Sequence, residues 1–110
     1  FSNPLETYGC DTAWLAFPIL IKDDAPFSRK EFQIYLEERK IQTRVVFTGN
    51  INRQPMCQNI KKVVLDSGYP NADAVMERGV LLPLHHGLTE DMFERFHQTV
   101  DQFIKDIEKR

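Results

Sequence analysis

The stretch AWLAFPILIK, residues 13–22, decides the fold together with the segment DDAPFSRKEFQIYLEERK, residues 23–40, that follows it. The first part is an almost unbroken apolar run, rich in aromatic and branched side chains. It predicts a strand that is buried on both faces, or buried on one face and packed at an interface on the other. Pro18 has no N–H for a ladder hydrogen bond, which places this strand at a sheet edge or at a bulge.

The second part carries the start signals of a helix. Ser28 is followed three residues later by Glu31, the spacing of a capping box. Phe27 precedes the cap and Phe32 lies four residues after it, which is typical of a hydrophobic staple. The pattern predicts a helix to about Lys40 with an inner stripe that consists of Phe32, Tyr35, Leu36 and Arg39.

Outward from this unit, strands and helices alternate. A second strand is expected over 42–47, with a turn at 48–50, and a third strand over 80–84. The intervening residues 51–70 look irregular, with a helical turn near 60–65, and Asn71 can cap a short helix through Arg78. Thr89 opens an amphipathic helix whose inner positions are Met92, Phe93, Phe96, Val100, Phe103, Ile104 and Ile107. We expect one α/β domain over 1–110, an α+β two-layer sandwich with a mostly antiparallel sheet of about three strands and helices on one face.

Composition is that of an ordinary globular domain. The 110 residues are 42% apolar and 27% charged, which excludes a disordered tail or a disulfide scaffold. Their formal charge of −2 provides no overall cationic field for nucleic acid or an anionic membrane. No apolar run spans a bilayer and no signal peptide follows Phe1, so we expect a cytoplasmic protein. The absence of Met at position 1 favours a piece of a longer chain.

The turn after the second strand is the main candidate site. In QTRVVFTGNINRQP, residues 42–55, Arg44 and Arg53 flank a Gly-Asn turn, and Asn50 adds amide groups. Guanidinium groups suit bidentate recognition of phosphate or carboxylate, and turns after strands often carry binding groups. The same residues are compatible with a surface loop whose arginines form salt bridges.

Other reactive side chains offer little chemistry. His85 and His86 are adjacent and cannot both point the same way from a strand, and no set of His, Cys and carboxylates has metal-ligand spacing. They suit a polar turn, or a His that faces a ligand. Cys10 and Cys57 are interpreted as reduced, buried thiols, although one disulfide between them remains open. No complete catalytic motif is visible.

The strings WLAFPILIK, SRKEFQIYLEERKIQTR, VVFTGNINRQP and NADAVMERGVLLPLHHGLTEDM together resemble the C-terminal small domain of the DegT/StrS-type sugar aminotransferase family. Within that family of fold type I enzymes, the loop IQTRVVFTGNINRQP most resembles the sugar 3-dehydrases, such as CDP-4-keto-6-deoxyglucose 3-dehydrase. The resemblance implies pyridoxal or pyridoxamine phosphate as cofactor, a nucleotide-linked keto sugar as substrate, and a role in lipopolysaccharide deoxysugar synthesis. It also implies a large cofactor-binding domain as partner and a homodimeric parent enzyme.

Residue by residue, the resemblance places the loop at the cleft between the two domains. Arg44 and Arg53 would contact an anionic group of the bound nucleotide sugar or cofactor adduct. Asn50 would orient the loop or bond the sugar, and His85 would lie at the cleft edge. His86 departs from the family, which usually has Pro there. The catalytic base, the aspartate at the cofactor ring and the cysteines of an iron–sulfur cluster found in one subgroup are not in this chain, so the domain alone should be inactive.

Two other readings compete. A free-standing, ferredoxin-like small-molecule binding or regulatory domain would bury both faces of residues 13–21 within itself or in a homodimer. A nucleic-acid module is disfavoured because the chain lacks net positive charge and a basic, aromatic face. The fragment interpretation instead predicts exposed apolar surface where a large domain would sit.

Overall fold

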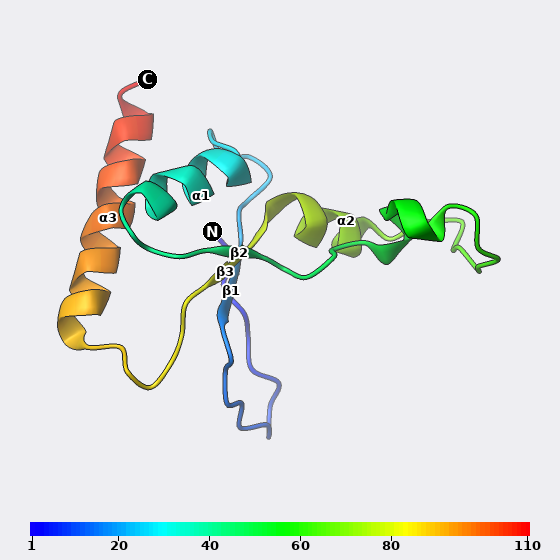
Figure 1. The fold of residues 1–110 in the computed structure, drawn as a ribbon, viewed down its shortest axis with the longest axis horizontal. Coiled ribbons are helices and arrows are strands. Elements are labelled where there is room, and N and C mark those ends of the chain that lie inside the picture. Colours follow the sequence, from blue (N-terminus) through cyan, green and yellow to red (C-terminus); the bar gives the residue numbers. More distant parts are fainter.

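The computed structural model describes all of residues 1–110 and contains a small antiparallel sheet with three helices (Figure 1). The strand order is β1-β3-β2, so the last strand of the sequence lies in the centre. The strands are β1 (Phe17–Leu20), β2 (Arg44–Val45) and β3 (Gly79–Leu82), and the helices are α1 (Arg29–Glu38), α2 (Pro70–Arg78) and α3 (Glu90–Glu108). Two 3₁₀ turns, η1 (Ile51–Arg53) and η2 (Pro55–Cys57), lie between β2 and α2.

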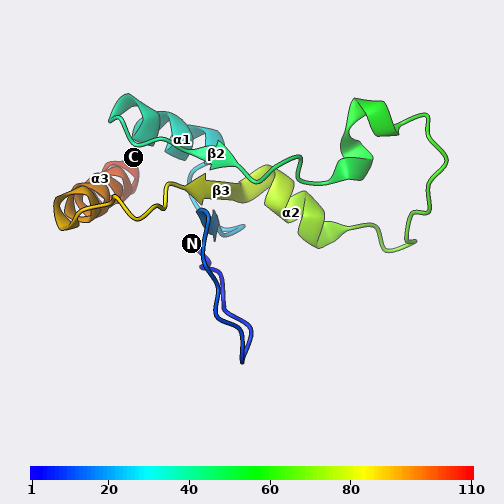
Figure 2. The same ribbon diagram turned by 60° about the horizontal axis from the view of Figure 1, so that its bottom comes forward.

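The core lies between one face of the sheet and helices α1 and α3. Ile19 pairs with Val80 in the ladder, and both side chains point to this face. There they meet Phe32 of α1 and Phe103 of α3, which are almost wholly buried. This arrangement confirms the predicted two-layer sandwich. Helix α2 ends directly at β3, has no buried residue, and extends away from the sheet (Figure 2).

Helix α1 begins as its sequence predicts. The Ser28 hydroxyl accepts a hydrogen bond from the Glu31 N–H, and the Glu31 carboxylate accepts one from the Ser28 N–H at 2.9 Å. The Phe27 and Phe32 rings lie 6.1 Å apart, as expected of a staple. The helix ends at Glu38, earlier than expected, because Lys40 adopts a left-handed φ of 63°.

The strands are shorter than the apolar runs that predict them. β1 occupies four residues at a sheet edge, as Pro18 requires, but Leu15 lies outside it and is 93% exposed. The expected strand over 42–47 retains only Arg44 and Val45. Pairing stops there because Phe47, with a φ of 46°, turns the backbone out of the extended conformation.

The connections differ more from prediction than the helices. The helical turn expected near 60–65 is wrong, since the only turns of this kind are η1 and η2. Pro70 occupies the first position of α2 and Tyr69 precedes it, so Asn71 is not the cap. Thr89 caps α3 as predicted, but Met92 and Phe93 at its start are exposed because they lie beyond the core.

Both cysteines are free thiols. Cys57 is buried, whereas Cys10 is exposed, contrary to the expectation that both are buried.

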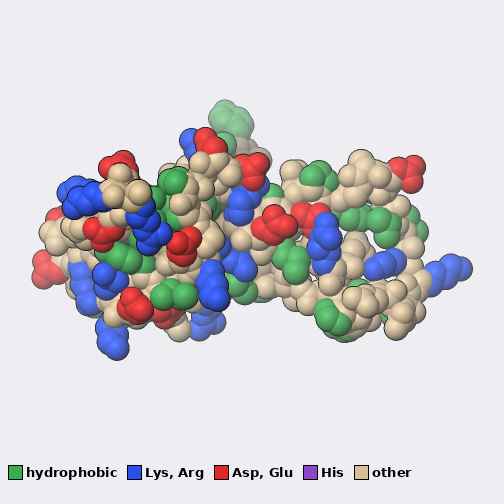
Figure 3. Space-filling model, turned by 90° about the horizontal axis from the view of Figure 1, so that it is seen from above, with side chains coloured by type: hydrophobic (Ala, Val, Ile, Leu, Met, Phe, Trp, Pro, Cys, Tyr) green, Lys and Arg blue, Asp and Glu red, His purple; other side chains and the backbone are tan.

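Two extended segments leave the core: residues 3–16, here called the N-terminal arm, and residues 47–69, called the central arm (Figures 1 and 2). They enlarge the radius of gyration to 16.4 Å, against about 13 Å for a compact chain of this length. The arms expose many large apolar side chains, and the space-filling view shows such side chains along the central arm at the right (Figure 3). The most exposed are Leu5, Tyr8, Leu15, Phe47, Met56 and Val63. None of the helices is both long enough and apolar enough to cross a bilayer.

Candidate functional site

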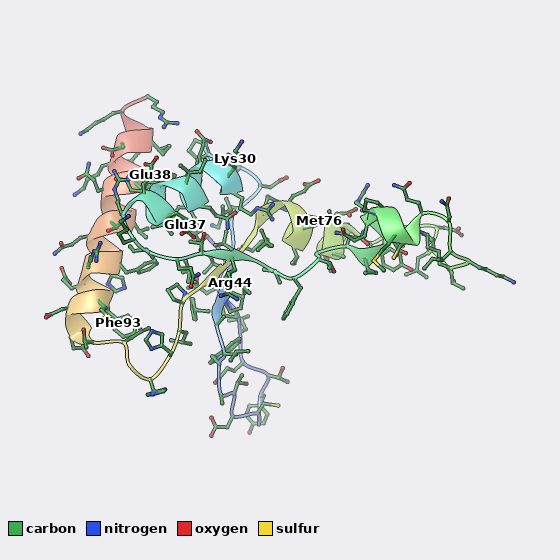
Figure 4. All side chains as sticks on the ribbon, viewed as in Figure 1. Lys30, Glu37, Glu38, Arg44, Met76 and Phe93 are labelled. Carbon is green, nitrogen blue, oxygen red and sulfur yellow. The ribbon has the colours of Figure 1, made fainter.

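Arg44 lies on the sheet face that no helix covers. It pairs with Leu81, whereas its neighbour Val45 pairs with the buried Val80, so the Arg44 side chain points away from the core. Figure 4 shows Arg44 on the side of β2 opposite α1. The side chain is exposed and forms no hydrogen bond or ion pair. The guanidinium fork of Arg44 is therefore available to an anionic ligand or partner.

The turn after β2 is held by backbone geometry. Gly49 has a φ of 62°, and its N–H donates to the Val46 carbonyl at 3.1 Å. The Gln54 amide donates to the Thr48 carbonyl at 2.9 Å, which closes the loop across its base. A Cβ at Gly49 would lie 2.3 Å from the Cβ of Met76, so only glycine fits against α2 here.

Asn50 and Arg53 converge on one carboxylate, that of Asp73 in the first turn of α2. The Asn50 amide donates to Asp73 Oδ1 at 2.7 Å. Arg53 donates through Nε to the same oxygen and through Nη2 to Oδ2 at 2.6 Å, a bidentate pair. Asn50 is buried, and its own oxygen accepts from the Asn52 N–H at 3.1 Å, so it also caps η1. Three N–H groups of Arg53, two on Nη1 and one on Nη2, are left for another group.

The electrostatics follow from this cluster. Hydrogen bonds from Arg53 and then Asn50 lower the pKa of Asp73 to about 2. The same carboxylate raises the pKa of Arg53 above its ordinary value. At neutral pH the two charges offset each other, so Arg44 is the uncompensated cation of the loop.

His85 lies in a different segment, the loop between β3 and α3. It is exposed, and its Nδ1 accepts a hydrogen bond from the Gly87 N–H at 3.1 Å. The His86 ring stands nearly perpendicular to it at 6.5 Å. The structure thus brings Asn50 and Arg53 together, sets Arg44 on the open sheet face, and puts His85 on a separate loop.

A shallow depression of about 310 Å³ adjoins the loop. Its wall is formed by residues of β2 and the turn with Arg29, Gln54 and Met76. Arg29 donates to the Met76 carbonyl, which joins the start of α1 to the end of α2. The depression therefore lies beside the start of α1 and the end of α2, next to the candidate loop.

Asp73 is the residue of this site that the sequence did not single out. It lies 20 residues from Arg53, and an acidic residue in the first turn of a helix is ordinarily explained by the helix dipole. No local pattern indicates that it accepts from two loop side chains. The only available signal was that Asp73 lies inside one of the strings that carry the family resemblance.

All seven lysines are exposed, and no cluster of three or more His, Cys, Asp or Glu side chains could hold a metal ion. What the site offers is a preorganised loop, one free guanidinium and, on a separate loop, an exposed imidazole.

These features can be compared with known proteins. The family model of the DegT/DnrJ/EryC1/StrS aminotransferase family matches residues 3–101, so the chain belongs to that family. The match confirms the resemblance carried by the four sequence strings.

Two curated relatives are similar along most of the chain. One is the dTDP-4-dehydro-2,6-dideoxy-D-glucose 3-dehydratase of Saccharopolyspora spinosa, 32% identical over 92% of this chain and 22% of its own length. The other is the lipopolysaccharide biosynthesis protein RfbH of Salmonella typhimurium, 32% identical over 91% of this chain and 23% of its own length. The chain thus spans less than a quarter of the length of either relative.

The fold also matches solved structures. GDP-4-keto-6-deoxy-D-mannose-3-dehydratase of E. coli, solved with bound hydrated pyridoxal phosphate, superimposes with a TM-score of 0.71. It is 21% identical and the match covers 81% of this chain and 23% of that one. At this sequence identity, the structural similarity establishes the fold of the chain and nothing about its reaction.

Proposed function

We propose that the chain is the C-terminal small domain of a nucleotide-sugar 3-dehydratase or aminotransferase that uses pyridoxal or pyridoxamine phosphate. In that enzyme it lines the substrate cleft and is inactive alone. The observation that carries the proposal is the unpaired Arg44 on an uncovered sheet face, beside a loop fixed by Asp73. The family and the two relatives support the reaction class and, through RfbH, a role in lipopolysaccharide deoxysugar synthesis.

The side chains of this chain suit contacts with the substrate and its phosphate groups. Pyridoxal phosphate supplies the electron sink when bound, and the protein around it provides orientation. In the proposed enzyme the cofactor ring is held by a large domain, as the family resemblance implies. Arg44 is suited to the phosphate or diphosphate of the substrate, and His85 to a polar contact at the cleft edge.

The exposed apolar arms support a partner domain over a free-standing regulatory domain. A self-sufficient domain would bury Leu15 and Val63, which here are 93% and 87% exposed. We infer that a large domain of the same polypeptide, and a second subunit in a homodimer, cover them.

The test uses the full-length protein that contains this chain. We expect it to bind pyridoxal phosphate, detected by absorbance, and to act on a nucleotide-linked 4-keto-6-deoxy sugar. Mass spectrometry separates the two reactions: a 3-dehydratase product has lost one oxygen, with two electrons supplied by an amino donor or a separate reductant, whereas an aminotransferase product carries an amino nitrogen in place of the keto oxygen.

Arg44→Ala should raise KM for the nucleotide sugar by about tenfold, the usual scale for one charge-assisted contact. Lys30→Ala is the matched control, because it removes an exposed cation from α1, away from the site (Figure 4). An unchanged KM for Arg44→Ala, or a protein that acts on no such sugar, would refute the proposal.

A further inference from the structure

The contacts between the candidate loop and α2 form one face of that helix. Asp73 accepts from Asn50 and Arg53, and Met76 lies one turn later, where it contacts Gly49. Positions three apart lie on the same side of a helix, so both contacts come from one stripe of α2. The loop is therefore attached at two successive points, one polar and one by close backbone approach.

The Asn50 part of the polar contact is shielded from solvent, whereas the Arg53 side chain is 61% exposed. The residue Asn50 is 6% exposed, and a buried amide destabilises the fold unless its groups are hydrogen-bonded. Both of its ends are satisfied, by Asp73 and by the Asn52 N–H. The Asp73 carboxylate therefore links Asn50, which precedes η1, to Arg53, which ends it, and fixes the orientation of the whole turn.

We propose that Asp73 is a positioning residue that holds the loop 48–55 on α2 and thereby sets the binding geometry of the site, with Arg53 as its partner. Its effect on substrate rests on the proposed function, whereas its effect on the loop does not. In this arrangement Arg53 acts mainly through Asp73, and Arg44 supplies the charge that meets the ligand.

The experiment compares variants of the full-length protein by hydrogen–deuterium exchange and by steady-state kinetics. Asp73→Ala should speed exchange in peptides that cover 48–57 by about tenfold, the scale of coupling within one hydrogen-bond network. Asp73→Asn, which keeps the acceptor oxygen, should have a smaller effect. The exchanged pair Arg53→Asp with Asp73→Arg should restore protection relative to either single change.

Kinetics separate positioning from general destabilisation. We expect Asp73→Ala to raise KM for the nucleotide sugar with little change in kcat, and the charge exchange to recover part of the loss. Asp23→Ala is the matched control, since it removes an exposed carboxylate paired with Arg78 at 3.7 Å and should leave loop exchange and KM unchanged.

Unchanged exchange of 48–57 in Asp73→Ala would overturn the inference whatever the activity. Equal acceleration throughout the chain, without rescue by the charge exchange, would also overturn it. If the protein does not act on a nucleotide sugar, the exchange measurements still decide the role of Asp73, so the two proposals fail separately.

Discussion

Arg44 and Arg53 are identical side chains that differ in their interactions because their surroundings differ. The sequence pairs them as flanks of one turn, yet Arg53 forms a bidentate pair with Asp73, whereas Arg44 has no partner. The difference comes from α2, which presents a carboxylate to one end of the turn and not to the other. A long-range contact of this kind has no local sequence signal.

The charge state of Asp73 predicts a pH dependence. Its folded-state pKa of about 2 lies below the ordinary Asp value, so its contribution to stability is full above the unfolded pKa of about 4. That contribution is lost as pH falls toward 2. The difference in unfolding free energy between the natural protein and Asp73→Asn should be constant from pH 5 to 8 and shrink below pH 4.

Urea denaturation across this pH range measures the difference. The comparison cancels carboxylates common to both proteins, including Glu31, whose pKa is lowered by hydrogen bonds from the Ser28 backbone and the Arg110 side chain. A difference that stays the same at pH 2.5 as at pH 7 would contradict the assigned pKa and its cause.

Gly49 predicts the strongest steric effect of the loop. Gly49→Ala would place a Cβ 2.3 Å from Met76 Cβ at a φ of 62°. We expect about 2 kcal/mol or more of destabilisation, from overpacking and a left-handed backbone together. Urea denaturation gives the value, and Gly68→Ala is the control, because Gly68 also has a positive φ but no atom near its Cβ position. Equal losses of unfolding free energy in both variants would show that backbone strain alone, without overpacking against Met76, causes the effect.

At the scale of elements, local signals predicted helices better than strands. The α1 start and the α3 cap are encoded within a few residues, by Ser28 with Glu31 and by Thr89, and both are confirmed. The strands are cut short by backbone torsions, as at Phe47, that apolar periodicity does not encode. The η1 turn is held by contacts of Asn50 and Arg53 with Asp73 of α2, which no short pattern specifies.

The capping box of α1 gives a prediction for one element. Ser28→Ala removes the acceptor for the Glu31 N–H at 3.2 Å and should cost about 1 kcal/mol of unfolding free energy. Ser67→Ala, at an exposed serine outside any helix, should change it by less than about 0.5 kcal/mol. Urea denaturation compares them; equal effects would show that the cap contributes nothing specific.

At the scale of the whole molecule, the chain exposes more surface than a compact monomer of the same mass. The chain exposes 8657 Å², about 2,300 Å² more than the roughly 6,300 Å² expected of a compact monomer of 12.9 kDa. A standard interface buries about 800 Å² on each partner, so the excess is enough for more than one. Apolar side chains supply much of it on both arms, which is the exposed surface that the fragment interpretation predicted.

This surface leads to opposite expectations for one substitution in two settings. In the isolated chain, Val63→Asp on the central arm should leave the unfolding free energy within about 0.5 kcal/mol, because the side chain packs against nothing. It should also lower self-association in sedimentation.

In the full-length protein the same change, Val63→Asp, should destabilise by about 2 kcal/mol or more, because it puts a charge into an apolar interface. Asp66→Asn, an exposed polar position on the same arm, should be neutral in both settings. A full-length protein that tolerates Val63→Asp as well as the isolated chain does would show that the central arm remains in solvent, and the partner surface would then have to be sought on the N-terminal arm.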